Sequence, residues 1–159
     1  MRNLLLALVL LGCAAQTGRV QPAAEVPVET ADWNQDGIRW QGYAEGLAAA
    51  RRSGKQVLLV IQGTPCPRCP AFSQQFREPE VIELAGRYIL VRVDADAEPD
   101  TAAMHAPDGT YVPRVFVLTS RGVRKDALQA GEEPSIYLPA EDSAQGLLRV
   151  MRAGLGMSP

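Results

Sequence analysis

Two cysteines three positions apart, Cys66 and Cys69, are the residues of this chain best suited to chemistry. Pro67 and Arg68 lie between them and complete a C-x-x-C motif. Where such a pair begins a helix, unpaired backbone N–H groups and the positive end of the helix dipole stabilise a thiolate at the first cysteine. Pro67 is tolerated in a first helical turn, and the cation of Arg68 should favour the thiolate further. The motif indicates thiol–disulfide exchange, in which Cys66 attacks and Cys69 resolves the mixed disulfide.

The same pair permits three other interpretations. Structural zinc takes four tetrahedral ligands, and this chain has three cysteines and one histidine, His105, so a zinc site is disfavoured. Copper(I) accepts two thiolates, so a Cu(I) carrier is an alternative. A redox-inert binding protein with a dormant pair is another. In the exchange interpretation the dithiol itself is the reactive group, and no metal or other cofactor is expected.

A short apolar run stands near the start of the chain. Arg2 gives it a positive beginning, Leu4–Leu11 is unbroken, and Gly12 and Cys13 end it. Such a run is too short to cross a hydrocarbon core of roughly 30 Å and is typical of a signal peptide. Its last four residues, Leu-Leu-Gly-Cys, resemble the bacterial lipobox. The resemblance implies that residues 1–12 are removed and that Cys13 is lipidated. The alternative is an ordinary secretory signal cleaved near Ala14 or Ala15, with Cys13 discarded.

Export has consequences for the three cysteines. If Cys13 carries lipid, Cys66 and Cys69 remain as one pair in an oxidising compartment, where a disulfide persists. A bridge between residues three apart closes a very small loop and adds little stability, so a structural role is disfavoured. The lipid would anchor the protein to the cell envelope. The lipobox resemblance, with Ala14 rather than an acidic residue after Cys13, implies delivery to the periplasmic face of the outer membrane.

Length and composition indicate one globular domain. The chain has 159 residues, of which 47% are hydrophobic and 21% charged. Residues 13–31 contain Pro22 and Pro27 without an amphipathic period, which is typical of a flexible tether, and residues 32–159 form the expected domain. The net charge is −2 and the basic residues form no stripe, so nucleic acid is not an expected partner.

The hydrophobic pattern predicts alternating elements that would position the pair. It predicts a helix at 43–52, a strand at 57–61, a helix from the cysteines to about residue 77, a short helix from 79, strands at 88–93 and 115–118, a strand beginning at 123, and a helix at 141–155. The cysteines then lie where the first strong strand meets a helix. Right-handed connections would place helices on both faces of a mixed central sheet, a three-layer α/β/α fold.

Three segments together resemble a known family. They are Trp40–Leu47, the Cys66–Cys69 motif, and His105–Arg114, which reads His-Ala-Pro-Asp-Gly-Thr-Tyr-Val-Pro-Arg. Over about residues 33–128 the chain is similar to the thioredoxin-domain proteins of the endoplasmic reticulum, in the anterior-gradient group. The resemblance implies a thioredoxin-like fold and a cis bond between Val112 and Pro113. It also implies that the Val112 backbone pairs with an extended substrate segment and that Pro113 keeps metal out of the site.

The chain departs from the thioredoxin pattern near the pair. Thr64 and Pro65 stand where an aromatic residue usually precedes the first cysteine, and Val60 stands where thioredoxins place a buried acid. Fast disulfide reduction of the thioredoxin kind is therefore not expected. Pro67 and Arg68 resemble the motifs of more oxidising members, in which a stabilised thiolate raises the reduction potential. The anterior-gradient group also includes chaperone-like members, so a redox-inert chaperone-like lipoprotein remains an alternative.

The sequence thus predicts a membrane-tethered thiol–disulfide oxidoreductase that acts on exported protein thiols or disulfides together with a redox partner protein. Other conspicuous residues are expected to be structural. His105 is expected in a loop, with general-acid catalysis as the alternative, and Trp33 and Trp40 are expected to pack in the core. The acidic residues of segment 94–100 lack the spacing of an EF-hand and are expected in a solvated loop.

Overall fold

The computed structural model describes residues 31–132, 135–140 and 143–157. The expected signal peptide at 1–12, the expected lipidation site Cys13 and the tether up to residue 30 lie outside the described residues. Among the helices within the described ranges, none is long and apolar enough to cross a membrane.

Four strands form one mixed sheet in the order β1-β3-β2-β4. The strands are β1 (Trp40–Gln41), β2 (Val57–Gln62), β3 (Ile89–Asp94) and β4 (Arg114–Leu118). Strand β3 runs parallel to both β1 and β2, whereas β4 runs antiparallel to β2. Strand β2 is therefore central, and its residues from Val57 to Ile61 are fully buried. A run of β-branched and apolar residues suits a strand that is covered on both faces.

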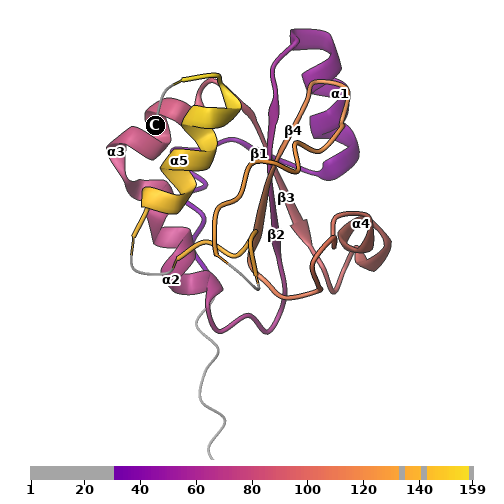
Figure 1. The fold of residues 1–159 in the computed structure, drawn as a ribbon, viewed down its shortest axis with the longest axis vertical. Coiled ribbons are helices and arrows are strands. Elements are labelled where there is room, and N and C mark those ends of the chain that lie inside the picture. Colours follow the sequence, from indigo (N-terminus) through magenta and orange to yellow (C-terminus); the bar gives the residue numbers. More distant parts are fainter. Residues whose placement is uncertain (1–30, 133–134, 141–142, 158–159) are drawn as a thin grey trace, which may run out of the picture.

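Helices cover both faces of this sheet (Figure 1). On one face lie α2 (Cys69–Gln74) with the 3-10 turn η1 (Gln75–Arg77), α3 (Pro79–Ala85) and α5 (Gln145–Gly154). On the other face lie α1 (Tyr43–Ser53) and α4 (Pro99–Met104). The predicted three-layer α/β/α arrangement with a mixed sheet is confirmed.

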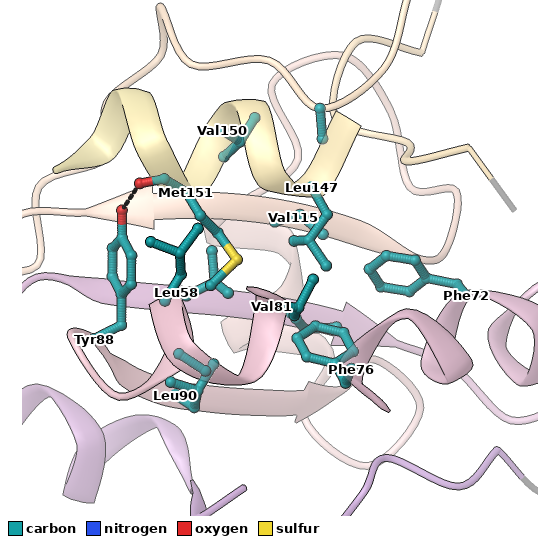
Figure 2. Packing of buried hydrophobic residues seen from close by; sticks show 14 of the residues in the cluster. Leu58, Phe72, Phe76, Val81, Tyr88, Leu90, Val115, Leu147, Val150 and Met151 are labelled. Carbon is teal, nitrogen blue, oxygen red and sulfur yellow. Dashed lines mark hydrogen bonds between the residues drawn. The ribbon is translucent and has the colours of Figure 1, made fainter. Parts of the chain in front are cut away.

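Alternation along β2 divides the core into two layers, because successive side chains of a strand point to opposite faces. Leu58 and Val60 belong to the cluster that contains both cysteines, whereas Leu59 and Ile61 belong to the cluster beneath α1 and α4. Figure 2 shows the first cluster, in which residues of α2, α3 and α5 meet the strands. The cysteine pair therefore belongs to the core layer between the sheet and helices α2, α3 and α5.

Two helices approach the sheet so closely that only glycine fits at the contact. A Cβ on Gly46 of α1 would lie 2.2 Å from Val91 Cγ2, and one on Gly154 of α5 would lie 2.2 Å from Tyr88 Oη. The Tyr88 hydroxyl donates a hydrogen bond of 2.5 Å to the Met151 carbonyl (Figure 2). Burial raises the pKa of Tyr88 to about 12, so this hydroxyl remains a donor at ordinary pH.

The structure corrects several predicted elements. The strand expected from Val123 is reduced to an isolated bridge between Leu118 and Arg124, because a tight turn brings residue 119 against 123 and the chain then turns away. The acidic segment expected as a loop ends in helix α4, which begins at Pro99, a residue suited to a first helical turn. The two-residue edge strand β1 was not predicted. Helix α5 begins at Gln145, and residues 141–142 of its predicted start lie outside the described residues.

Candidate active site

Cys66 and Cys69 are joined by a disulfide at the end of the central strand. Strand β2 ends at Gln62, a short segment follows, and α2 begins at Cys69. Both cysteines are nearly buried, with exposed fractions of 4% and 2%. The prediction that the pair begins a helix is correct for Cys69 only. Cys66 lies in the preceding turn, where its carbonyl accepts a hydrogen bond of 3.2 Å from the Cys69 N–H.

Two acidic side chains hold the segment between β2 and the pair. Asp94, at the end of β3, accepts hydrogen bonds from Gln62 Nε2 at 3.3 Å and from Thr64 Oγ1 at 3.1 Å. Asp96 accepts a hydrogen bond from the Thr64 backbone N–H. Asp94 also accepts from the backbone N–H of Asp96 at 2.9 Å. The acidic residues are therefore not merely solvated; two of them fix the approach to the cysteines.

The segment before β4 meets the segment before the pair. The Val112–Pro113 peptide bond is cis, as the family resemblance implies, and Pro113 is buried. A Cβ on Gly63 would lie 3.2 Å from Val112 Cγ2, so the two segments are in contact. The Thr64–Pro65 bond is also cis, which the sequence did not predict.

An aromatic cluster lies in the core layer that contains the pair. The ring centroids of Trp33 are 5.9 Å from those of Phe72 and of Phe76, and the Trp40 ring lies 6.0 Å from Trp33. The Trp40 indole N–H donates to the Trp33 carbonyl at 2.7 Å. The prediction that both tryptophans pack in the core is confirmed: Trp33 is 2% exposed, and Trp40 is partly buried against the same cluster.

A hollow of about 180 Å³ opens beside the disulfide. Both cysteines, Trp33, Thr64 and Arg92 are among the residues that line it. The Arg92 guanidinium lies 5.6 Å from the centroid of Trp33 and 5.7 Å from that of Trp40, a cation–π arrangement. Burial lowers the pKa of Arg92, and the nearby charge of Asp94 opposes this effect. Arginine remains a cation at ordinary pH.

Pro67 and Arg68, the two residues between the cysteines, do not line this hollow. Pro67 is exposed, and Arg68 is partly buried in a separate hollow of about 350 Å³, which Leu138 and Arg149 also line. Two cations are thus associated with the pair: Arg68 adjoins both cysteines in the motif, and Arg92 lines the hollow beside them. Whether either one tunes the cysteines remains a prediction.

His105 lies away from the pair, on the opposite face of the sheet. It follows α4, is 5% exposed, and packs 5.8 Å from the ring of Phe116. Its Nε2 shares a hydrogen bond of 2.8 Å with the Tyr43 hydroxyl. Burial lowers the pKa of His105 to about 4, helped by the charges of Arg124 and Arg114. The expected loop position is thus the end of a short helix, and a role as general acid at the cysteines has no geometric support.

Arg114 holds the chain around the cis proline from the same opposite face. It is 1% exposed, and its Nη1 donates hydrogen bonds of 2.8 Å to the carbonyls of His105 and Gly109. Its Nη2 donates at 3.3 Å to the carbonyl of Ala102. A buried cation bound to several carbonyls fixes the loop that leads to Pro113.

The described ranges bring together no group of three or more His, Cys, Asp or Glu side chains that could hold a metal ion. Sequence reasoning missed Arg92, Asp94 and Asp96 as residues of this site. A signal for Arg92 was present, since it is the one charged residue inside the apolar run Ile89–Val93. For Asp94 and Asp96 there was no such signal, because their contacts with Thr64 depend on the pairing of β2 with β3.

The chain was compared with known proteins. A family model described as thioredoxin-like matches residues 39–120, just over half of the chain. Anterior gradient protein 3 of Mus musculus is 34% identical over 96 residues, covering 59% of this chain and 57% of that protein. The anterior gradient protein 2 homolog of Homo sapiens is 33% identical over 97 residues, covering 59% of this chain and 53% of that protein. The chain therefore spans about half the length of these curated relatives.

Two solved structures are also similar to this one. The first is a thioredoxin from Thermus thermophilus, with a TM-score of 0.45, 24% identity, and coverage of 51% of this chain and 64% of that one. The second is a disulphide isomerase from Xylella fastidiosa Temecula1, with a TM-score of 0.46, 24% identity, and coverage of 65% and 79%.

Proposed function

The chain belongs to the thioredoxin-like family, and from this premise we propose that it is a thiol–disulfide oxidoreductase whose reactive group is the Cys66–Cys69 pair. The observation that carries the proposal is the position of the disulfide. It lies a few residues after the central strand, and the segment before it touches the segment that contains a cis proline. A disulfide between residues three apart adds little to stability, which favours a role in thiol–disulfide exchange over a structural role.

The proposed reaction transfers two electrons between the pair and a substrate. A substrate thiolate attacks Cys66 Sγ, the Cys66–Cys69 bond breaks, and Cys69 leaves as a thiolate. A second substrate thiolate then attacks the substrate sulfur of the mixed disulfide and releases Cys66 as a thiolate. The substrate dithiol becomes a disulfide and the pair becomes a dithiol. In the reverse direction Cys66 attacks a substrate disulfide, and Cys69 resolves the intermediate.

We further propose that the substrates are exported proteins. In this proposal the Val112 backbone pairs with an extended substrate segment, since Val112 precedes the cis proline and contacts Gly63 beside the pair. Lipid on Cys13 would anchor the domain to the bacterial cell envelope, on the periplasmic face of the outer membrane. A redox partner protein would restore the pair after each turnover. The apolar run that ends at Cys13 supports the anchor, and the disulfide is compatible with an oxidising compartment.

One observation favours a second candidate function. Both cysteines are nearly buried, at 4% and 2% exposed, and thiol exchange requires access to one sulfur. A redox-inert binding or chaperone-like lipoprotein that uses the fold as a scaffold is therefore the alternative. It predicts that Cys66→Ala changes no exchange rate.

Trapping of the mixed disulfide tests the proposal. A Cys69→Ser variant, expressed in cells with an oxidising envelope, should accumulate covalent complexes through Cys66, because the resolving thiol is gone. Cys66→Ala and the double variant are matched controls, and both should trap nothing. Absence of trapped partners from Cys69→Ser would support the scaffold alternative. A stoichiometric Cu(I) complex that disappears in Cys66→Ala would instead support a copper carrier.

A further inference from the structure

Within the described ranges, the hollow beside the Cys66–Cys69 disulfide is lined by a single charged side chain, which is positive. Among the described residues that line it, Arg92 is the only charged one. The others are apolar or neutral and include the amide side chains of Gln35 and Gln62. A small, partly enclosed space with one cation and no anion in its wall favours a negatively charged occupant.

Arg92 is held in place without a direct counter-ion. Its guanidinium is flanked by the rings of Trp33 and Trp40. Its Nη1 atom is buried and has no hydrogen-bond partner, and no ion pair within the described part of the chain includes it. Buried hydrogen-bonding groups of native proteins are nearly always partnered, so this nitrogen, on a residue that lines the hollow, is a group that an anionic ligand could bind.

The nearby acidic groups do not fill this role. The charge of Asp94 partly offsets that of Arg92, but the Asp94 carboxylate accepts hydrogen bonds from Gln62 and Thr64 and forms no ion pair with Arg92. Asp96 is engaged by the Thr64 N–H. Neither aspartate lines the hollow, and Arg68 lines a separate one. The charge that faces the space beside the sulfurs is therefore that of Arg92.

We propose that this hollow is a subsite for a low-molecular-weight thiol that carries a carboxylate or sulfonate close to its sulfur. The inference rests on the proposed exchange activity and names a second substrate class for it. The volume of about 180 Å³ suits a molecule of a few heavy atoms, since one water occupies about 30 Å³ of liquid. The anionic group lies against Arg92, and the thiol sulfur reaches the disulfide in the same wall.

The reaction balances with two molecules of the small thiol. The thiolate of the first attacks Cys66 Sγ, a new S–S bond forms, and the electron pair of the old bond leaves on Cys69 as a thiolate. The thiolate of the second attacks the small-molecule sulfur of this mixed disulfide and releases the Cys66 thiolate. Two small thiols are oxidised to one small disulfide, and the pair is reduced by two electrons.

Three small thiols that differ in charge test the subsite. They are 2-mercaptoethanesulfonate, which is anionic, 2-mercaptoethanol, which is neutral, and cysteamine, which is cationic. The rate at which each opens the disulfide is measured by mass spectrometry after alkylation, in the full chain carrying Cys13→Ser, kept in mild detergent at low ionic strength. Arg92→Met should lower the ratio of the anionic to the cationic rate about tenfold, while Arg92→Lys should keep it within about threefold. Because the same three thiols are used on every variant, differences in their intrinsic reactivity cancel when the rate ratios of variant and parent are compared.

Controls separate the possible outcomes. Arg39→Met removes the same charge from an exposed position and should leave the ratio unchanged. In the parent chain, 1 M salt should reduce the ratio, because the Debye length falls to about 3 Å; this readout does not depend on any variant folding. Equal slowing of all three thiols in Arg92→Met would overturn the subsite, because Arg92 would then act on the cysteines themselves. If no thiol opens the disulfide in the parent chain, the proposed exchange fails and the subsite with it.

Discussion

Arg92 on β3 lies opposite Val60 on β2 in the register of the parallel pair. Val60 is fully buried in the core layer that contains both cysteines, and Arg92 lines the hollow beside them. Of these two neighbouring residues, only Arg92 is charged, and its charge is positive. A cation near a dithiol stabilises the thiolate form and raises the reduction potential. We therefore predict that Arg92 shifts the pair towards the oxidising end of the range.

Asp94 should matter for stability through the segment that precedes the cysteines. Its carboxylate accepts hydrogen bonds from Gln62, Thr64 and the backbone N–H of Asp96. Asp94→Asn replaces one acceptor oxygen with a donor, so we expect the free energy of unfolding to fall by about 1–2 kcal/mol. Urea denaturation of the oxidised protein measures this. Asp36→Asn changes the same charge at an exposed site and should stay within about 0.5 kcal/mol of the parent.

His105 should make stability depend on pH below neutrality. Its pKa is about 4 in the folded protein, against the ordinary value of 6.5. The unfolded chain therefore binds a proton more readily, and the stabilisation is complete above about pH 6.5 and lost as the pH falls to about 4. After allowance for solvent screening we expect a loss of roughly 1–2 kcal/mol across this window.

The variant His105→Gln isolates this effect, because His105 is the single histidine of the chain and glutamine retains a partner for the Tyr43 hydroxyl. Unfolding free energies measured at several pH values should show a flatter profile for the variant between pH 6.5 and 4. Parallel profiles for parent and variant would show that burial does not shift the histidine.

Gly46 should not tolerate even a methyl group. An added Cβ would lie 2.2 Å from Cγ2 of the fully buried Val91, so α1 would have to move away from the sheet. We expect Gly46→Ala to destabilise the fold by about 1–2 kcal/mol, despite the better helix propensity of alanine. Gly86→Ala is the matched control, since its backbone is right-handed and its Cβ would meet nothing closer than 3.4 Å. Thermal unfolding of the two variants compares them directly, and equal midpoints would contradict the packing of α1.

Arg114 should be needed for the loop that leads to the cis proline. Arg114→Met keeps most of the buried volume but leaves the carbonyls of Ala102, His105 and Gly109 without this donor. We expect a loss of about 3 kcal/mol or more in unfolding free energy, with partial recovery in Arg114→Lys. Denaturant titration measures both. A lysine variant no better than methionine would show that the fork of donors, rather than the charge, is what the loop requires.

Much of the fold could be predicted from local patterns. The buried runs of β2, β3 and β4 and the amphipathic α5 have the periodicities that mark strands and helices. The two-residue β1 could not be found this way, because it is too short to show alternation and exists through its pairing with β3. Helix α4 was missed because its acidic beginning looks like a solvated loop, although Pro99 marks a first helical turn.

The residues of the candidate site could be predicted only where they form a motif of residues close together in the sequence. Cys66, Cys69 and the Val112–Pro113 bond could be named from motif and resemblance. Arg92 could not be placed beside the cysteines, because its position depends on the register between β2 and β3 and on the tryptophans that hold its guanidinium.

The reduction potential of the Cys66–Cys69 pair tests the central claim most directly. The full chain carrying Cys13→Ser, in which the pair supplies the only cysteines, is equilibrated in glutathione buffers, and its oxidised fraction is read from the mass shift of alkylated thiols. We predict reversible exchange with a potential near or above about −180 mV, as expected for a pair with a cation in the wall of the adjoining hollow. A value near −270 mV would contradict the oxidising assignment. A disulfide that never exchanges with glutathione would contradict the enzyme itself and favour the scaffold.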